Sequence, residues 1–266
     1  MNRRSRLLPA ALCFATVSCA PRLVTLPSGT GTAFPDYART FEQATERCRA
    51  VRTLAAVLSI SGRAGNHRLR AKLDAGFEVP ARVRLEFPAP GKPIFTYVAV
   101  GEDATLVLPR EGRVLRNAPP AATLEALAGV AIGPDDLRTI VAGCGFATGA
   151  VTAGRAFDRA WVAVDAGDAT SWLQQVDGAW QMTAAVRGAV EVRYADFEDG
   201  RPATIRLRAT PDRRVGEATA LTDLTIRLSQ VDINEPLGAE VFRVDVAADA
   251  TPLTLEQLRE AGPLGR

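Results

Sequence analysis

The residues that could carry catalysis are few, and none stands in a pattern that an enzyme would need. His67 is the only histidine in the chain, so neither a zinc site with several imidazoles nor a histidine relay can be assembled. Asp135 and Asp136 stand where a helix would begin, and the helix dipole favours negative charge at that end. No serine stands in a Gly-x-Ser-x-Gly turn, and no glycine-rich loop ends in Lys-Ser or Lys-Thr. We therefore expect a protein that is not an enzyme and that has neither a metal nor a cofactor.

The four cysteines divide into an N-terminal pair and a pair further along the chain. Cys13 and Cys19 lie in or directly after a segment with three arginines and an apolar run, the pattern of a secretory signal too short to span a membrane. Cys48 and Cys144 are then an even pair in an oxidising compartment. We predict a disulfide between them, which contributes about 4 to 5 kcal/mol in the chain-entropy model. Two unrelated buried thiols are the alternative.

The residues before Cys19 resemble a bacterial lipobox, the cleavage signal of lipoproteins. The run is Ala-Thr-Val-Ser-Cys, with Thr16 where leucine is usual. The resemblance implies that residues 1–18 are removed and that Cys19 carries a lipid anchor, whereas an ordinary export signal with an incidental cysteine is the alternative. Ala20, an uncharged residue after the cysteine, resembles the sorting signal for the outer membrane. We therefore expect an anchored outer-membrane protein that faces the periplasm.

The charge of the chain excludes a nucleic-acid partner. The sequence has 32 lysines and arginines against 30 acids, and the predicted signal takes three of the arginines with it. The rest is close to neutral, without the basic excess that a polyanion would require. Proline and glycine are frequent up to Pro35, so we predict a signal peptide over 1–18, a flexible tether over 19–35 and one domain over 36–266.

Helical periodicity appears in three places in this domain. Apolar residues recur at intervals of three and four over 37–51 and again over 124–145, which predicts one helix and then a pair of short helices. A last helix is predicted over 254–261. Each helix of the pair is too short to be stable alone, so the pair must pack on the strands. The residues expected to begin and end the two helices of the pair are Thr123, Gly129, Pro134 and Gly143.

The remaining segments alternate apolar and polar residues, as strands with one buried face do. Short turns between them indicate antiparallel neighbours. If about eleven segments pair, the sheet must curl. The predicted fold class is therefore α+β, a curved antiparallel sheet of about eleven strands that forms an incomplete β-barrel, with helices covering the concave face. The candidate strands are 57–61, 67–74, 82–87, 94–100, 105–108, 114–116, 160–164, 171–175, 180–186, 190–196, 203–208, 221–229 and 241–246.

The order of these elements and several spaced residues resemble a known family. The residues that carry the likeness are Gly129, Ile132, Leu137, Arg138 and Gly143, and the strand Arg84–Phe87 that leads to Pro90 and Gly91. This pattern is similar to that of the outer-membrane lipoprotein receptors (LolB-like) of the LolA/LolB fold. The resemblance implies a barrel with a helical lid, whose cavity accepts acyl chains of lipoproteins from a periplasmic carrier protein and passes them to the outer membrane. That family has an apolar residue between the proline and the glycine, whereas here the two adjoin.

Apolar side chains between the strands and the helical pair are the candidate ligand contacts. A dry groove suffices, because transfer of about 16 carbons from water gains on the order of 10 kcal/mol. Ordinary core packing is the alternative for each residue, since alternation does not separate a filled core from a cavity wall. The residues predicted to line the cavity are Val83, Leu85, Phe87, Val98, Leu137, Ile140 and Trp161.

Two other functions fit the same pattern. The first is an anchored, non-catalytic assembly module that holds a protein partner, which a large exposed apolar patch would favour. The second is a carrier of another envelope lipid, since a sheet with a helical lid is indifferent to the head group.

Overall fold

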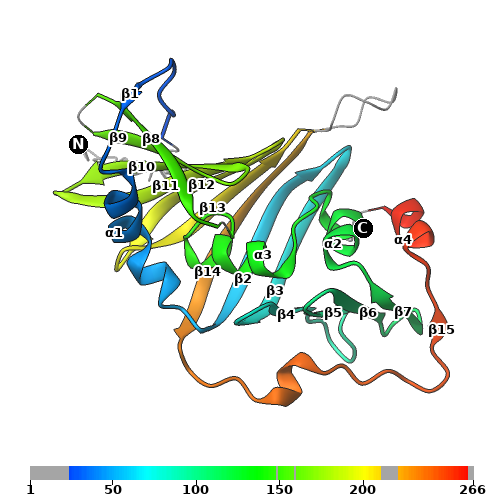
Figure 1. The fold of residues 1–266 in the computed structure, drawn as a ribbon. Helices are drawn as coiled ribbons and strands as arrows, with labels where there is room; N and C mark the ends of the chain where they lie inside the picture. Colours follow the sequence, from blue (N-terminus) through cyan, green and yellow to red (C-terminus); the bar gives the residue numbers. More distant parts are fainter. Residues whose placement is uncertain (1–23, 148, 159, 211–220, 263–266) are drawn as a thin grey trace, which may run out of the picture.

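The computed structural model describes residues 24–147, 149–158, 160–210 and 221–262. These residues form one open sheet of 15 strands with four α-helices, which confirms the α+β fold with a curved, incomplete barrel (Figure 1). All of these elements follow the predicted signal peptide. The strand order is β1-β8-β9-β10-β11-β12-β13-β14-β2-β3-β4-β5-β6-β7-β15.

The strands outnumber the prediction of about eleven partly because both edges of the sheet are formed by two-residue strands. Only the pair of β7 and β15 is parallel, and the other neighbours are antiparallel. The strands are β1 (Thr32–Ala33), β2 (Thr53–Ala64), β3 (His67–Glu78), β4 (Arg82–Phe87), β5 (Phe95–Val100), β6 (Asp103–Leu108), β7 (Arg113–Ala118), β8 (Val151–Phe157), β9 (Trp161–Ala166), β10 (Ala169–Val176), β11 (Ala179–Arg187), β12 (Val190–Glu198), β13 (Arg201–Ala209), β14 (Thr222–Ile233) and β15 (Thr251–Pro252).

The helices lie on the concave side of the sheet or at its edge (Figure 1). Helix α1 packs against β8 and β11, α3 lies against β4 and β13, and α2 lies beside β6 and α4. None of the helices in the described ranges is both long and apolar enough to cross a membrane. The helices are α1 (Tyr37–Arg49), α2 (Pro120–Ala128), α3 (Pro134–Ala142) and α4 (Leu255–Ala261), with a short 3-10 helix η1 (Ala239–Phe242).

Alternation along each long strand separates a buried face from an exposed face. On β3, for example, Leu69 and Leu73 are buried whereas Arg68 and Lys72 are exposed. Most buried apolar residues of β2 to β7 and of β9 to β14 join one apolar core beneath the helices. This core spans both halves of the chain because β14 pairs with β2 in the middle of the sheet. The concave face of the sheet is therefore apolar, and the outer face is polar on strands such as β3.

The helical pair ends where the sequence predicts, but its first helix begins earlier. Gly129 and Gly143 end α2 and α3 in the left-handed conformation, with φ of 73° and 92°. Helix α2 begins at Pro120, so Thr123 lies inside the helix and is not its N-cap. The Thr123 hydroxyl donates to the carbonyl oxygen of Pro119, 3.0 Å away. Proline at the first helical position favours this earlier start.

One predicted strand is absent from the structure, and one long strand was not predicted. Residues 241–246 do not form a strand, because the segment crosses the outer side of β4 and β5 as η1 and irregular chain. The Arg84 guanidinium donates to the carbonyl oxygens of Val241 and Arg243. In a sheet these two carbonyl oxygens would instead accept hydrogen bonds from a neighbouring strand. Strand β8 was not predicted, because its residues are mostly exposed or half-buried and show little alternation.

Part of the segment predicted as a tether contacts the sheet. Thr32 and Ala33 form β1 beside β8, and Leu26 packs on an aromatic cluster that includes Trp161 and Trp172. The carbonyl oxygen of Val24 accepts a hydrogen bond from Arg193 at 3.0 Å. The predicted signal peptide over 1–18 and the predicted anchor Cys19 lie outside the described residues.

Candidate ligand-binding cavity

A cavity of about 100 Å³ lies between the helical pair and the concave face of the sheet. Every residue of its wall is apolar, and the walls come from six strands and from the helical lid, which we define as α2, the loop 129–133 and α3. A space with no polar lining suits an apolar group and would penalise a charged one. The lining residues are Leu58, Ile60, Leu69, Ala71, Leu73, Leu85, Phe95, Leu124, Leu127, Ala128, Val130, Ile132, Leu137, Leu207, Leu224 and Ile226.

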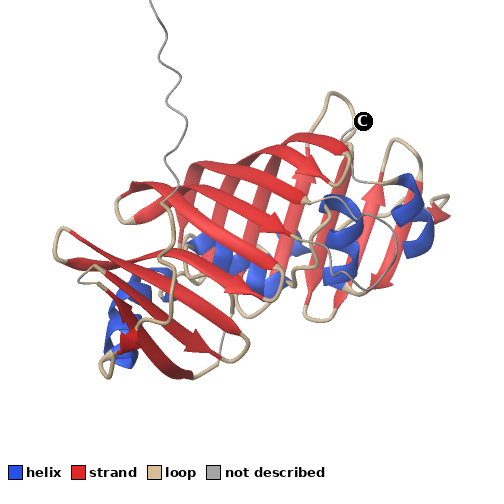
Figure 2. Ribbon diagram, turned by 90° about the horizontal axis from the view of Figure 1, so that it is seen from above, coloured by secondary structure: helices blue, strands red, loops and turns tan. Residues whose placement is uncertain are grey.

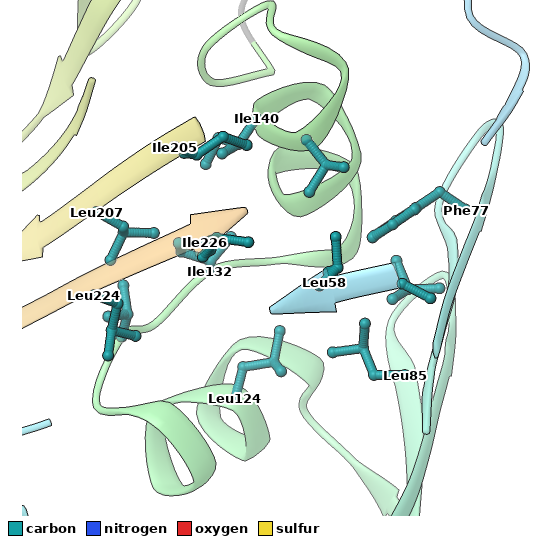
Figure 3. Close-up of a cluster of buried hydrophobic side chains, with 14 of the residues drawn as sticks. Leu58, Phe77, Leu85, Leu124, Ile132, Ile140, Ile205, Leu207, Leu224 and Ile226 are labelled. Carbon is teal, nitrogen blue, oxygen red and sulfur yellow. The ribbon is translucent and has the colours of Figure 1, made fainter. Parts of the chain in front are cut away.

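The lid and the sheet reach toward the same space from opposite sides (Figure 3). Leu124 of α2 and Ile132 of the loop point toward the side chains of Leu58 and Ile226 on β2 and β14. Because β2 and β14 are far apart in the sequence, their pairing is what places these side chains together. The cavity is thus a property of the assembled sheet and lid.

Five of the predicted cavity residues belong to the core beneath the lid. Leu85 and Leu137 line the cavity, from β4 and α3. Val83 and Ile140 are fully buried in the same core without reaching the cavity wall. Phe87 is partly buried and packs against this core at the end of β4. Their contact with a ligand stays a prediction.

The other two predicted cavity residues, Val98 and Trp161, lie on the outer face of the sheet. On β5, Tyr97 and Ala99 enter the core, so the side chain of Val98 between them points to the opposite side. Trp161 belongs to a separate cluster with Phe157 and Ala163. The C-terminal segment covers Val98, and the N-terminal segment covers Trp161. Both side chains are therefore apolar and buried, and the sequence pattern does not distinguish them from residues of the concave face.

Sequence reasoning also missed the cavity wall formed by β13 and β14. Leu207, Leu224 and Ile226 line the cavity, and each stands at an apolar position of a predicted strand. Their alternation was a usable signal for burial. It did not indicate which strands would face the lid, because strand order is absent from local periodicity.

Helix α3 is held by covalent, ionic and hydrogen bonds. The predicted disulfide is confirmed, since Cys48 and Cys144 are bonded and join α1 to the residue that follows the end of α3. Asp136 forms an ion pair with Arg187 of β11, with 2.7 Å between Oδ2 and Nη1. The buried Tyr194 hydroxyl donates to the carbonyl oxygen of Ile140 and accepts from the backbone N–H of Gly145. Burial raises the pKa of this hydroxyl, which keeps it neutral as a donor.

Helix α2 has fewer directional bonds to the rest of the fold. The Tyr97 hydroxyl, whose pKa is also raised by burial, donates to the carbonyl oxygen of Pro120 at 3.3 Å. Thr222 donates to the carbonyl oxygen of Gly129 at 3.1 Å. The ion pair of Glu125 with Arg259 of α4 is long, at 3.6 Å, and half exposed. Apolar contact with the sheet and α4 therefore provides most of the attachment of α2.

Two larger hollows lie near the C-terminal end of α3, with volumes of about 220 and 430 Å³. Both include Arg201, and charged groups such as Glu198 or Arg47 contribute to their walls. They suit water or a polar group better than an acyl chain. No group of three potential metal ligands occurs within the described ranges, and His67 is half-buried at the start of β3.

Comparison with known proteins identifies the fold. No family model matches the chain, and no curated protein matches its sequence. A LolA superfamily protein from Nitrosomonas europaea is similar in structure, with a TM-score of 0.52 and 14% identity over 78% of this chain and 98% of that chain. A DUF1329 family protein from Desulfovibrio piger has a TM-score of 0.50 and 11% identity over 78% and 97%. The chain therefore has a LolA-like fold, which does not single out the LolB-like receptors.

Proposed function

We propose that the protein is a non-catalytic lipid-binding protein of the bacterial cell envelope, whose cavity takes acyl chains. The observation that carries this proposal is the wholly apolar cavity beneath a two-helix lid. Each methylene that enters such a space from water gains about 0.8 kcal/mol. No polar group in the wall would lose its hydrogen bonds when the chain enters. An acyl chain therefore fits the chemistry of the cavity better than a polar metabolite.

The cavity is smaller than an acyl chain, so we propose that the lid moves when a chain binds. About 150 Å³ accommodates a benzene-sized molecule, and the cavity here has about 100 Å³. A longer acyl chain would enter only if one side of the lid withdrew from the sheet. Helix α2 is the mobile side in this proposal, because apolar contacts can slide or separate without breaking a buried ion pair or a disulfide.

The finer role that we propose is transfer of lipoproteins or other lipids to the outer membrane. In this role Cys19 carries the lipid anchor, the domain faces the periplasm and a periplasmic carrier protein delivers the acyl chain. The lipobox-like run before Cys19 and the LolA-like fold both support this placement.

The distribution of exposed apolar side chains does not favour an assembly module that binds a protein partner. In the described ranges the large exposed apolar residues are Val24, Val100, Val176 and Leu221. They stand on different elements and form no contiguous patch of the kind that marks a docking surface.

Native mass spectrometry tests the proposed function. The chain without residues 1–18, carrying Cys19→Ser, is purified from cells and its bound lipids are extracted. We expect copurified acyl lipid, and the head group would separate lipoprotein transfer from carriage of another lipid. A chain that is free of lipid and takes none up on addition would contradict the proposal.

A matched pair of variants locates the binding site. Leu137→Glu places a charge in the cavity wall at a half-buried position and should abolish lipid uptake. Val100→Glu places the same charge on β5 at a position that is 44% exposed and should leave uptake unchanged. Circular dichroism verifies that both variants fold. Equal uptake by the two variants would exclude this cavity as the site.

A further inference from the structure

The outer face of the sheet carries a group of cations that the cavity does not use. We define the basic surface as five exposed side chains on three neighbouring strands: Arg227 on β14, Arg63 on β2, and Arg68, Arg70 and Lys72 on β3. Figure 2 shows this side of the central strands, with α3 behind them. No carboxylate of the described residues forms an ion pair with any of the five.

Cross-strand pairing brings like charges together on the basic surface. Arg63 of β2 is directly opposite Arg68 of β3, an arrangement that destabilises a sheet. Ser59 lies between Lys72 on one side and Arg227 on the other. The fold gains no ion pair from this arrangement. A counter-charge from outside the chain would remove the repulsion.

A shallow hollow of about 330 Å³ lies within the basic surface. Arg70, Lys72 and Arg227 contribute to its wall together with Ser59 and Ser61, and the rest of the wall is apolar, from Ile60, Ala71 and Phe87. Guanidinium and ammonium groups beside hydroxyl donors are the groups that bind phosphate oxygens in proteins. The small serine side chains leave room between the cations for an anionic group.

Acidic residues on the same face do not cancel this charge. Asp223 of β14 lies opposite Arg63 of β2, but it forms its ion pairs with Arg206 and Arg208, and the Arg206 guanidinium holds the pKa of that carboxyl below its usual range. Asp74 is exposed on the same face of β3, two residues beyond Lys72. The basic surface thus has an excess of positive charge at its centre.

The N-terminal segment leaves the fold on the same face. Val24 accepts its hydrogen bond from Arg193, which lies on the outer face of β12, and Leu26 covers the outer aromatic cluster. The predicted anchor Cys19 precedes Val24 by five residues, which span about 17 Å when fully extended. A lipid anchor at Cys19 would therefore hold the outer face close to the bilayer.

We propose that the basic surface docks the protein on the phosphate groups of an anionic lipid bilayer, with the outer face against the membrane and the helical lid directed away from it. This inference goes beyond acyl-chain binding, because it concerns lipid head groups and a surface outside the cavity. It also explains why the cations are spread over three strands and about 13 Å along them, since a bilayer presents many phosphates over an extended plane.

Vesicle flotation tests the docking surface. The chain without residues 1–18, carrying Cys19→Ser, should bind vesicles that contain phosphatidylglycerol and should not bind vesicles of phosphatidylcholine alone. The triple variant Arg70→Gln, Lys72→Gln, Arg227→Gln should bind about fivefold more weakly for each cation, or on the order of 100-fold in total. Added salt should weaken the binding of the parent chain through screening.

The matched control removes three exposed arginines outside the basic surface: Arg39, Arg49 and Arg116, each changed to Gln. This control and Leu137→Glu should both bind anionic vesicles like the parent, because neither alters the basic surface. Equal losses in the two triple variants, loss in Leu137→Glu, or equal binding to neutral vesicles would overturn the proposal. Failure of the parent to bind anionic vesicles would also overturn it and would favour an acidic protein partner.

Discussion

Helices α2 and α3 both belong to the lid of the cavity and each has nine residues, yet they are attached in different ways. Each has one buried tyrosine hydroxyl that donates to a backbone carbonyl of the helix or its end, Tyr97 for α2 and Tyr194 for α3. Only α3 has in addition a disulfide at its end and a partly buried ion pair with the sheet. Helix α2 depends mainly on apolar packing, including that of Leu258 of α4, which is 1% exposed.

The difference between the two helices shows how a lid can open on one side only. Apolar contacts carry no directional requirement, so α2 can leave and return without an unpaired buried charge. Separation of α3 would break the ion pair between Asp136 and Arg187 and would be limited by the disulfide. We therefore expect amide hydrogens of α2 to exchange with solvent faster than those of α3.

The largest effect is expected from removal of the disulfide. The bond closes a loop with a sequence separation of 96, so the double variant Cys48→Ala, Cys144→Ala should lose about 4 kcal/mol of unfolding free energy. Urea unfolding measures this loss, and a reducing agent should affect the parent but not the variant. Hydrogen exchange of α3 should become faster and approach that of α2. A variant with unchanged stability and slow exchange in α3 would refute the assigned role of the bond.

The second largest effect is expected from loss of the ion pair of α3, in comparison with loss of the ion pair of α2. Asp136→Asn breaks a pair whose side chains are 24% and 20% exposed, and it should cost about 2 kcal/mol. Glu125→Gln breaks the pair between α2 and α4, whose side chains are 52% and 51% exposed, and it should cost less than about 0.5 kcal/mol. Urea unfolding of both single variants is the measurement. Equal costs would contradict the proposed difference in attachment.

The smallest effect concerns the two tyrosines. Tyr194→Phe removes two hydrogen bonds and should cost about 1.5 kcal/mol, whereas Tyr97→Phe removes one long bond and should cost about 0.5 kcal/mol. Burial raises the pKa of both hydroxyls above the ordinary 10.0. Their stabilising contribution is therefore complete below about pH 10 and is lost as pH rises above it. Thermal unfolding across this pH range should show that each variant loses less stability at alkaline pH than the parent does. An identical loss of stability would contradict the contribution assigned to the tyrosine hydroxyls.

Local patterns in the sequence were sufficient for most elements. The residues of α1, α3 and α4, and those of β3, β4 and β12, carry clear helical or alternating periodicity, because each element buries one face. The disulfide was also predictable, since export would leave only Cys48 and Cys144 to pair. Two of the seven predicted cavity residues, Leu85 and Leu137, line the cavity, whereas Val98 and Trp161 lie on the outer face of the sheet, where terminal segments bury them.

Local patterns in the sequence predict the fold class, the helical lid and its glycine ends, and the pairing of Cys48 with Cys144. They do not predict that β14 pairs with β2, and this one pairing builds both the cavity wall around Leu58 and Ile226 and the basic surface around Ser59 and Arg227. The physical reason is that periodicity records whether a side chain is buried. It contains no information on which distant strand supplies the neighbouring side chains, and the cavity and the basic surface consist of such neighbours.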